Sequence, residues 1–353
     1  MTSVANILLW LHKPSSFNRA ANRIILTLLL ALVVGCGARP EIIQLEGTKM
    51  GTSYRITVVA DQLAPDDLHQ RIDDLLSTVD NSMSTYKSDS ELSRFNRLPV
   101  GQQMQISPEF ARVLQISRDI WQRSGGAFDP TIGPLVDLWG FGPTLSDNTA
   151  PSAQQVSVAL ESTGFQHIVL AERQLSKRHP VQLDLSAVAK GYAVDLVADL
   201  LEMLALPDYL VEVGGEIRVS GLNPDGQPWR IAIEQPALIS SVDRIISVAD
   251  RSVATSGDYR NYFEQQGVRY SHILDPRTGS PIQHNLASVT VLAASCAEAD
   301  AWATAFLVMG PEQSRTLADK LGIPIYLLVG RGDTFEHMKS DQFAPYMQQA
   351  EPI

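Results

Sequence analysis

Residues 287–310, ASVTVLAASCAEADAWATAFLVMG, contain the change from strand to helix that decides the fold class. The apolar run 287–292 has the length and composition of a buried strand. Ser295 follows it, with Glu298 three residues later, and this spacing is typical of a capping box at a helix start. Gly310 then marks the end of the helix. A strand that leads directly into a capped helix is therefore predicted here.

Two oxygen-bearing side chains share one face of this predicted helix. Asp300 and Thr304 are four residues apart, so both project from the same side. A carboxylate and a hydroxyl are hard oxygen ligands of the kind that bind magnesium or calcium. The alternative interpretation is a solvated Asp300 and a Thr304 that bonds back to its own helix.

A second junction of the same kind lies at residues 184–192, DLSAVAKGY. A strand is expected over 181–185 and a helix over 187–206, with Ser186 as the N-cap. The free amides at such a helix start can bind an anion.

Lys190 and Gly191 need a reason beyond helix propensity. A lysine in the first turn opposes the helix dipole, and a glycine costs about 1 kcal/mol relative to alanine. Contact with a phosphate or nucleotide would explain both residues. Tight packing against a neighbouring element would explain Gly191 equally well.

Two further segments contain paired glycines. Residues 125–135, GGAFDPTIGPL, form a long apolar loop, which favours a binding loop over an ordinary connector. Residues 213–216, VGGE, look like a strand interrupted by two glycines, which predicts a bulge or a close backbone approach.

His272 is the candidate proton carrier. It lies at a predicted strand end just before the turn residues Asp275 and Pro276. The pKa range of histidine suits general base catalysis. A histidine that is merely solvated or hydrogen-bonded is the alternative.

The remaining periodicity predicts a mixed fold. Amphipathic helices are expected over 65–83 and 108–123, the second with Ser107 as N-cap. Short strands alternate with these helices, and a turn at 223–226 is expected to join two strands as a hairpin. This combination of hairpins and helical crossovers indicates an α+β fold. The further strands are expected at 54–59, 168–170, 209–213, 217–219, 229–234, 245–249, 270–273 and 287–292.

The N-terminal segment 1–35 has the features of an export signal. Three cations without an acidic residue precede the apolar run 24–34, which is shorter than the roughly 20 residues that span a bilayer. The run ends at Cys36 in a sequence that resembles the lipobox of bacterial lipoproteins. Cleavage would leave Cys36 as a lipidated N-terminus, and a buried helix with a chance cysteine is the alternative.

Charge and cysteine content limit the partners. Cys296 is the one other cysteine, so no internal disulfide is expected after lipidation of Cys36. Loss of the three signal-segment cations changes the formal net charge from −11 to −14. A charge of this sign opposes binding to a phosphate backbone, so nucleic acid is not an expected partner.

Taken in order, these segments resemble the ApbE family of FAD:protein FMN transferases over about residues 45–335. The resemblance rests on six or more ordered motifs: 50–54, 126–130, 184–195, 213–216, 255–259, 272–279 and 299–304. It implies antiparallel or mixed sheets flanked by helices, with FAD in a cleft and Mg2+ beside its diphosphate.

The resemblance also implies roles for individual residues. Asp300, Thr304 and the backbone carbonyl of Ala187 would hold Mg2+, while His272 would be the base and Asp300 the other catalytic residue. FAD contacts are implied at Met50, Tyr86, Ala127, Phe128, Asp129, Asp184, Lys190 and Ile273.

The implied reaction moves FMN from FAD to a threonine hydroxyl of a target protein and releases AMP. Subunits of the Rnf complex or of sodium-translocating NADH:quinone reductase are expected acceptors, and a lipid anchor would hold the enzyme at a bacterial membrane with them. Two other functions remain open: a magnesium-dependent FAD pyrophosphatase and a non-catalytic flavin-binding lipoprotein. The expected organisation is a signal peptide at 1–35, an anchored spacer at 36–45, a transferase domain at 46–340 and a tail at 341–353.

Overall fold

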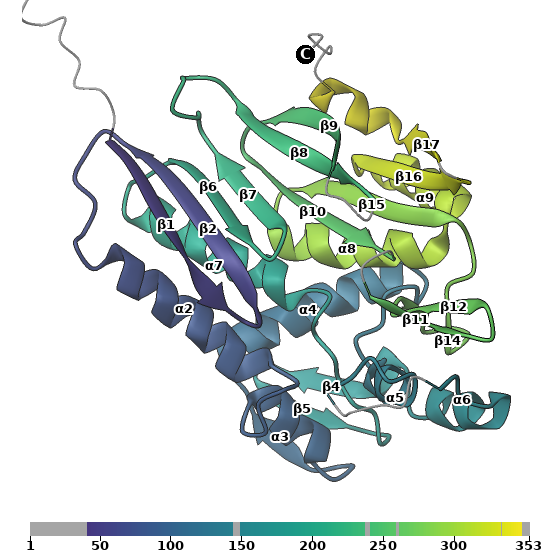
Figure 1. Ribbon diagram of the computed structural model, residues 1–353. Coiled ribbons are helices and arrows are strands. Elements are labelled where there is room, and N and C mark those ends of the chain that lie inside the picture. Colours follow the sequence, from purple (N-terminus) through teal and green to yellow (C-terminus); the bar gives the residue numbers. More distant parts are fainter. Residues whose placement is uncertain (1–40, 144–148, 237–240, 259–260, 333, 348–353) are drawn as a thin grey trace, which may run out of the picture. The chain divides into compact units, whose positions relative to one another are not determined.

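The computed structural model describes residues 41–143, 149–236, 241–258, 261–332 and 334–347. Within these residues the main element is an eight-stranded sheet in the order β1, β2, β6, β7, β10, β15, β16, β17 (Figure 1). All neighbouring strands are antiparallel. The strands are β1 (Glu41–Lys49), β2 (Thr52–Ala60), β6 (Asp208–Val213), β7 (Glu216–Ser220), β10 (Arg251–Gly257), β15 (Leu286–Ala293), β16 (Ile325–Arg331) and β17 (Thr334–Lys339).

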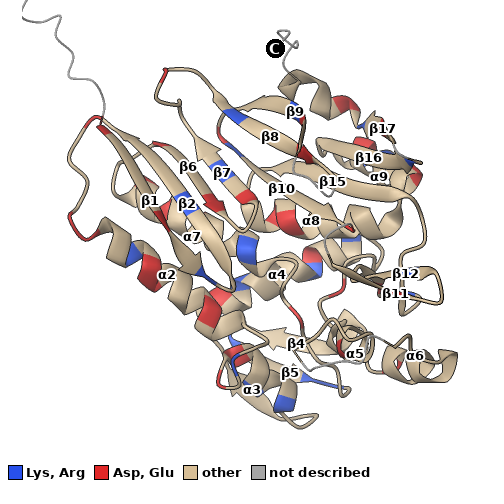
Figure 2. Cartoon of the chain, in the orientation of Figure 1, with Lys and Arg blue, Asp and Glu red and all other residues tan. Residues whose placement is uncertain are grey.

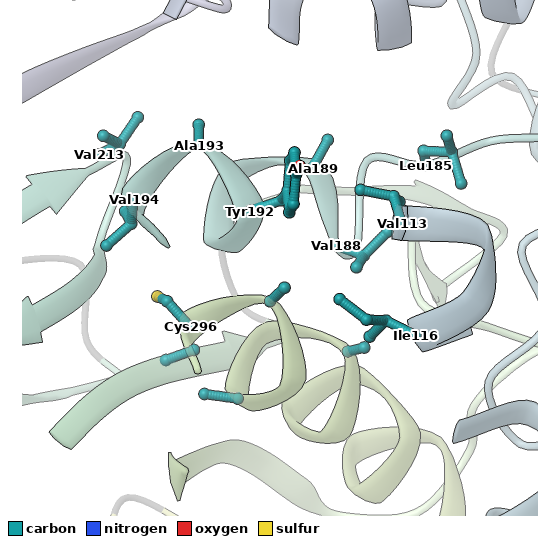
Figure 3. Packing of buried hydrophobic residues seen from close by; sticks show 14 of the residues in the cluster. Val113, Ile116, Leu185, Val188, Ala189, Tyr192, Ala193, Val194, Val213 and Cys296 are labelled. Carbon is teal, nitrogen blue, oxygen red and sulfur yellow. The ribbon is translucent and has the colours of Figure 1, made fainter. Parts of the chain in front are cut away.

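Helices cover one face of this sheet. They are α2 (Leu68–Met83), α4 (Pro108–Arg123), α7 (Ala189–Met203), α8 (Cys296–Met309) and α9 (Pro311–Leu321). Helix α8 is apolar on nearly all sides because it is enclosed by the sheet, α7 and α4. Figure 3 shows this packing, with Val194 of α7 near Cys296 at the start of α8 and Ile116 of α4 beside a later part of the same helix. The core therefore lies between the sheet and its helices.

A two-stranded ribbon covers part of the opposite face. It consists of β8 (Trp229–Gln235) and β9 (Ser241–Val248). Trp229, Ile231 and Ile233 alternate with exposed residues and pack on outward-facing side chains of the main sheet. The short 3-10 helix η2 (Asp341–Tyr346) adds the fully buried Phe343 to this second cluster.

Smaller elements surround the sheet and its helices. A three-stranded sheet combines β3 (Gln103–Gln105), β5 (Gln174–Lys177) and β4 (Ile168–Ala171). Two ribbons pair β11 (Tyr262–Gln265) with β12 (Val268–Ser271) and β13 (Leu274–Asp275) with β14 (Ser280–Pro281). The remaining helices are α3 (Glu91–Arg97), α5 (Gly133–Leu138), α6 (Ala153–Leu160) and η1 (Phe165–His167).

The α+β class is confirmed, and the helix predicted at 108–123 has the bounds expected from its sequence. The side chain of Ser107 accepts a hydrogen bond from the amide of Phe110 at 3.2 Å. Pro108 takes the first helical position, where its missing N–H costs nothing. The helix predicted at 65–83 begins slightly later, at Leu68.

Three local predictions were wrong. Residues 181–185 form no strand, because Gln182 makes only an isolated bridge to Ile132. The glycines of 213–216 form a two-residue turn between β6 and β7 rather than a bulge, since Val213 pairs with Glu216 across them. The alternative prediction of a close approach agrees with the structure, because a Cβ at Gly214 would lie 2.9 Å from Thr52 Cγ2. The turn at 223–226 exists, but β7 and β8 belong to different sheets, so it joins two layers and is not a hairpin.

The described residues from Glu41 onward form one compact unit. Among them, no helix combines the length and the apolar character needed to cross a membrane. The expected signal segment 1–35 and Cys36 lie outside the described residues. Acidic and basic residues are interspersed over the elements of this unit (Figure 2).

Candidate active site

The start of α8 sets the position of the candidate metal ligands. Ser295 accepts a hydrogen bond from the amide of Glu298 at 3.2 Å, as its sequence position predicts. The reciprocal bond of a capping box is not found in the described part of the chain. Instead, Asp195 of α7 accepts from the amides of Cys296 and Ala297. Ser295, the N-cap residue of α8, and Asp195 on α7 therefore both bind amides of the first turn of α8.

Asp300 and Thr304 lie on one face of α8, as predicted, and both line a cavity. Asp300 is 3% exposed, and its Oδ2 accepts a hydrogen bond from the amide of Gly191 at 3.1 Å. The hydroxyl of Thr304 lies 3.2 Å from that of Ser256 on β10. Asp300 is consequently not the solvated carboxylate of the alternative interpretation.

Lys190, Glu216 and Asp300 form a compact charged group. The Lys190 ammonium lies 3.4 Å from a Glu216 carboxylate oxygen and 3.9 Å from Asp300 Oδ2. Burial lowers the pKa of Lys190, but the carboxylates of Asp300 and Glu216 outweigh burial and raise it above its ordinary value. Burial also raises the pKa of Asp300, and it raises the pKa of Glu216 to about 8 although Lys190 opposes that shift. Lys190 is thus held as a cation between the carboxyl groups of Asp300 and Glu216.

Gly191 allows α7 to approach α8 closely. A Cβ atom at this position would lie 2.3 Å from the carbonyl oxygen of Cys296, which is far inside van der Waals contact. Of the two explanations offered by the sequence, tight packing is therefore sufficient for Gly191. Its amide also bonds to Asp300, so the same contact orients the candidate metal ligand.

The segment before α7 is held by Asp184. Its Oδ1 accepts a hydrogen bond from the Ser186 amide at 2.8 Å, and its own amide donates to the Pro130 carbonyl at 2.7 Å. Ser186 is not the N-cap of α7, because the helix begins later, with Val188 at that position and no side-chain cap. The predicted role of Ser186 was therefore wrong, whereas Asp184, Ser186 and Ala187 all line the cavity.

The loop 125–135 forms another wall of the cavity with Ala127, Phe128 and Asp129. Asp129 is 8% exposed, and burial raises its pKa. Its carboxylate accepts from the amide and hydroxyl of Thr131 at 2.8 and 2.6 Å and from the amide of Phe165 at 3.0 Å. Both carboxylate oxygens of Asp129 hold the loop, so this side chain shapes the wall.

His272 reaches the cavity from the segment after β12. Its Nδ1 lies 2.9 Å from the carbonyl oxygen of Asn261. Because a carbonyl only accepts, Nδ1 carries the proton and Nε2 of the neutral ring keeps its lone pair. Burial lowers the pKa of His272 and outweighs the hydrogen bond to the Asn261 carbonyl, which raises it; the charge of Lys190 lowers it further. The ring is therefore held neutral, in the tautomer that can accept a proton at Nε2.

One cavity of about 1330 Å3 joins these walls. Most of the residues predicted for the site line it, but Met50 and Tyr86 do not. Met50 lies in the turn between β1 and β2, packed against the core, and the Tyr86 side chain is 77% exposed. The predicted residues in the lining are Ala127, Phe128, Asp129, Asp184, Ala187, Lys190, His272, Ile273, Asp300 and Thr304.

Several other residues of the cavity lining have no role that was predicted from the sequence. Glu216 is the most notable, because its Oε2 is buried without a hydrogen-bond partner among the described residues. Ser256 and Asn261 contact Thr304 and His272 directly. In the sequence, Glu216 is marked only by its position directly after Gly214 and Gly215. Its neighbour Lys190 is distant in sequence, so the charged group could not be predicted from this segment.

The donor atoms around Asp300 fit a magnesium ion. No group of three or more His, Cys, Asp or Glu residues suited to a metal occurs in the described ranges. Mg2+ often uses only one or two protein carboxylates together with substrate phosphates. Asp300, the Thr304 hydroxyl and Glu216 Oε2, which has no hydrogen-bond partner in the part of the chain that the structure describes, are hard oxygen donors beside one cavity.

Comparison with known proteins gives consistent family matches. The model of the ApbE family matches residues 50–327. The FAD:protein FMN transferase of Vibrio cholerae serotype O1 is 44% identical over 322 residues, which are 90% of this chain and 96% of that protein. The protein of the same name from Escherichia coli K12 is 38% identical over 340 residues, 92% of this chain and 97% of that protein.

Solved structures agree with these sequence matches. The flavin transferase ApbE from Vibrio cholerae superposes with a TM-score of 0.81 at 42% identity, covering 87% of this chain and all of that chain. The apo form of the Pseudomonas stutzeri flavinyl transferase ApbE has a TM-score of 0.81 at 40% identity, with 88% and 98% coverage.

Proposed function

The chain belongs to the ApbE family, and we propose on that premise that it transfers FMN from FAD to a threonine hydroxyl of an acceptor protein. The relatives from Vibrio cholerae and Escherichia coli are named FAD:protein FMN transferase, which supports FMN transfer from FAD to a protein. The observation that carries the proposal is the meeting of a neutral His272 with Lys190, Asp300 and Thr304 in one cavity.

His272 acts as the general base in this proposal. Its Nε2 takes the proton of the threonine hydroxyl as the threonine oxygen bonds to the FMN-side phosphorus. The bond from that phosphorus to the bridging oxygen breaks, and AMP leaves with the bridging oxygen. The hydrogen bond from Nδ1 to the Asn261 carbonyl supports this role, because it orients the ring and stabilises the imidazolium that forms.

Asp300, Thr304 and the backbone carbonyl of Ala187 are the proposed magnesium ligands. When bound, Mg2+ would neutralise charge on the diphosphate and favour departure of AMP. The amide of Gly191 donates a hydrogen bond to Asp300 Oδ2, which orients the carboxylate. Glu216 places a buried oxygen beside the same cavity, so it is available to a metal-bound water.

FAD is proposed to lie in this cavity against Ala127, Phe128, Asp184 and Ile273. Lys190 offers a positive charge to the phosphates from its position between two carboxylates. Asp129 shapes the wall through its loop contacts. The proposed contacts from Met50 and Tyr86 rest on the family resemblance alone.

The proposed setting is the bacterial cell envelope, with the enzyme facing the periplasm. Lipidation of Cys36 would hold the catalytic unit at a membrane, near acceptor subunits of Rnf or of sodium-translocating NADH:quinone reductase. The basic, apolar and small-residue order of residues 1–36 supports this proposal.

The test is to incubate the full chain with FAD, Mg2+ and an acceptor subunit of sodium-translocating NADH:quinone reductase, and then to weigh the acceptor by mass spectrometry. The expected result is a mass gain equal to FMN, with AMP released. Free FMN and AMP beside an unmodified acceptor would overturn the transferase in favour of a pyrophosphatase. Bound FAD without turnover would leave only a flavin-binding protein.

A further inference from the structure

The cavity reaches both faces of the main sheet. Pairing between β7 and β10 ends at Ile217 and Val253, while β10 continues along β15 as far as Gly257. Asp300 and Lys190 line the cavity from the helices on one face. Its lining also includes residues that face the β8–β9 ribbon on the other side. The site is therefore open toward the ribbon face at the point where β10 extends past β7.

The alternation of side chains along the strands identifies the floor of the part of the cavity that lies on the ribbon face of the sheet. Tyr54 and Val213 point toward the helices, since both belong to the core cluster between the sheet and its helices. Their neighbours Arg55 and Glu212 must point to the opposite face. Ile217 also faces that side, because it packs with the ribbon cluster. These three residues line the cavity, so its floor there is the outer surface of β2, β6 and β7.

Strand β8 forms a wall of this part of the cavity, which is called the groove below. Arg230, Ala232 and Glu234 line the cavity from β8. Among the described residues, β8 pairs only with β9, so its second edge carries backbone groups that no strand satisfies. Trp229 and Ile231 are buried against the sheet, so this open edge is held firmly in place.

We propose that the threonine-bearing segment of the acceptor protein binds in this groove as an extended strand added to the free edge of β8. The inference rests on the proposed function, because it identifies how the second substrate enters. An extended chain pairs its backbone with an open strand edge and still presents a side chain forward. The groove is continuous with the part of the cavity that holds His272, so the side chain presented by the bound strand can be the reacting threonine.

Charge on the groove also favours a protein occupant. Arg55 and Arg230 are exposed and share the groove lining with Glu212 and Glu234, so the groove carries charges of both signs, as suits a polar polypeptide segment. Both arginines line the same groove. Such groups are available to side chains or carbonyl groups of a bound segment.

Backbone amide hydrogen exchange tests the proposal directly. The full chain is mixed with an acceptor subunit of sodium-translocating NADH:quinone reductase whose threonine is replaced by valine, so that the complex forms without reacting. Amides of residues 229–235 on the open edge should exchange more slowly with this acceptor than with FAD alone. Unchanged exchange across β8 in a saturated complex would overturn the proposal.

A blocked groove supplies the second measurement. Ala232→Cys is made in the full chain with Cys36→Ser, so that the buried Cys296 is the only native thiol left, and is labelled with a bulky maleimide. Labelling should lower kcat/KM for the native acceptor by about tenfold, the loss expected for one to two backbone hydrogen bonds. The acceptor should also slow the labelling. Met203→Cys, at a 77% exposed position outside the cavity, is the matched control and should keep its activity when labelled.

The outcomes separate this inference from the proposed function. FMN transfer at an undiminished rate by the labelled Ala232→Cys protein would overturn the inference and leave the transferase intact. A rise in KM for FAD, with the acceptor parameters unchanged, would assign the groove to FAD instead and would also overturn it. If the unlabelled enzyme transfers no FMN to the native acceptor, the proposed function fails, and the inference fails with it.

Discussion

The carboxylate of Asp195 on α7 accepts hydrogen bonds from the amides of Cys296 at 2.8 Å and Ala297 at 2.9 Å, so one helix caps the start of another. Asp195 is only 8% exposed, and Arg218 pairs with it at 3.1 Å. Because α8 carries Asp300 and Thr304, this cap links the α7 and α8 sides of the candidate metal site.

Asp195→Ala should therefore weaken both the fold and metal binding. Loss of a buried cap that serves two amides is expected to lower the free energy of unfolding by about 2 kcal/mol. Urea denaturation measures this loss, and a Mg2+ titration of FMN transfer should show a higher requirement for the metal. Asp199→Ala, one turn later with a 58% exposed side chain, should change stability by no more than about 0.5 kcal/mol. Equal effects of the two substitutions would contradict the capping role.

Asp300→Ala should remove most of the dependence on magnesium. The proposed metal loses its only carboxylate from α8, and transfer should slow by about 100-fold or more. The measurement is the rate of FMN transfer against Mg2+ concentration. Glu298→Gln on the same helix should keep the wild-type response, since its amide retains the bond to Ser295. Full magnesium-dependent activity in Asp300→Ala would exclude Asp300 as a ligand.

His272→Ala should bind FAD but transfer FMN about 100- to 10,000-fold more slowly, the usual contribution of a general base. FAD affinity is measured by fluorescence titration and turnover by acceptor mass. His167→Ala, whose histidine lies on η1 outside the cavity, is the control. Unchanged turnover in His272→Ala would exclude this residue as the base.

The pH profile of kcat/KM should carry the signature of the same histidine. Burial lowers the pKa of His272 below 6.5. The neutral ring is the active form, so activity is present above that pKa and is lost as the pH falls through it. The acid limb should therefore bend below pH 6.5, and it should disappear from the residual activity of His272→Ala. An acid limb that persists unchanged in the variant would belong to another group.

Gly191→Ala should separate α7 from α8. The added Cβ would lie 2.3 Å from the Cys296 carbonyl oxygen, which is backbone and cannot move alone, so a loss of about 2 to 3 kcal/mol in unfolding free energy is expected. Thermal or urea denaturation measures it. Gly330→Ala is the control, because its Cβ would meet only the Asn285 carbonyl oxygen at 3.4 Å. A stable Gly191→Ala protein with normal activity would show that the helix contact can relax.

Features that depend on neighbouring residues could be predicted from the sequence. Ser107 and Pro108 began α4 where expected, because caps and proline act through bonds within one turn. The shared face of Asp300 and Thr304 followed from helix geometry alone. Helix α6 was not predicted, although Ser152 and Gln155 form a complete capping box that the sequence displays.

Features that depend on distant pairing could not be predicted in this way. The glycines 214 and 215 suit a bulge or a turn equally, and only the pairing of β6 with β7 selects the turn. The segment 181–185 alternates apolar and polar residues like a strand, yet within the described ranges it makes only an isolated bridge to Ile132. The turn at 223–226 is local, but the layer that receives β8 is decided by the burial of Trp229 and its neighbours.

The sequence by itself determined the α+β class, the main helices and, through ordered motifs, the family resemblance, because periodicity, caps and motif spacing are local properties of the chain. Tertiary structure alone decided that Lys190, Glu216 and Asp300 meet in one buried group and that a neutral His272 shares their cavity. These contacts join residues far apart in the chain. Their geometry depends on how the sheet and helices bury apolar surface together, which no local pattern records.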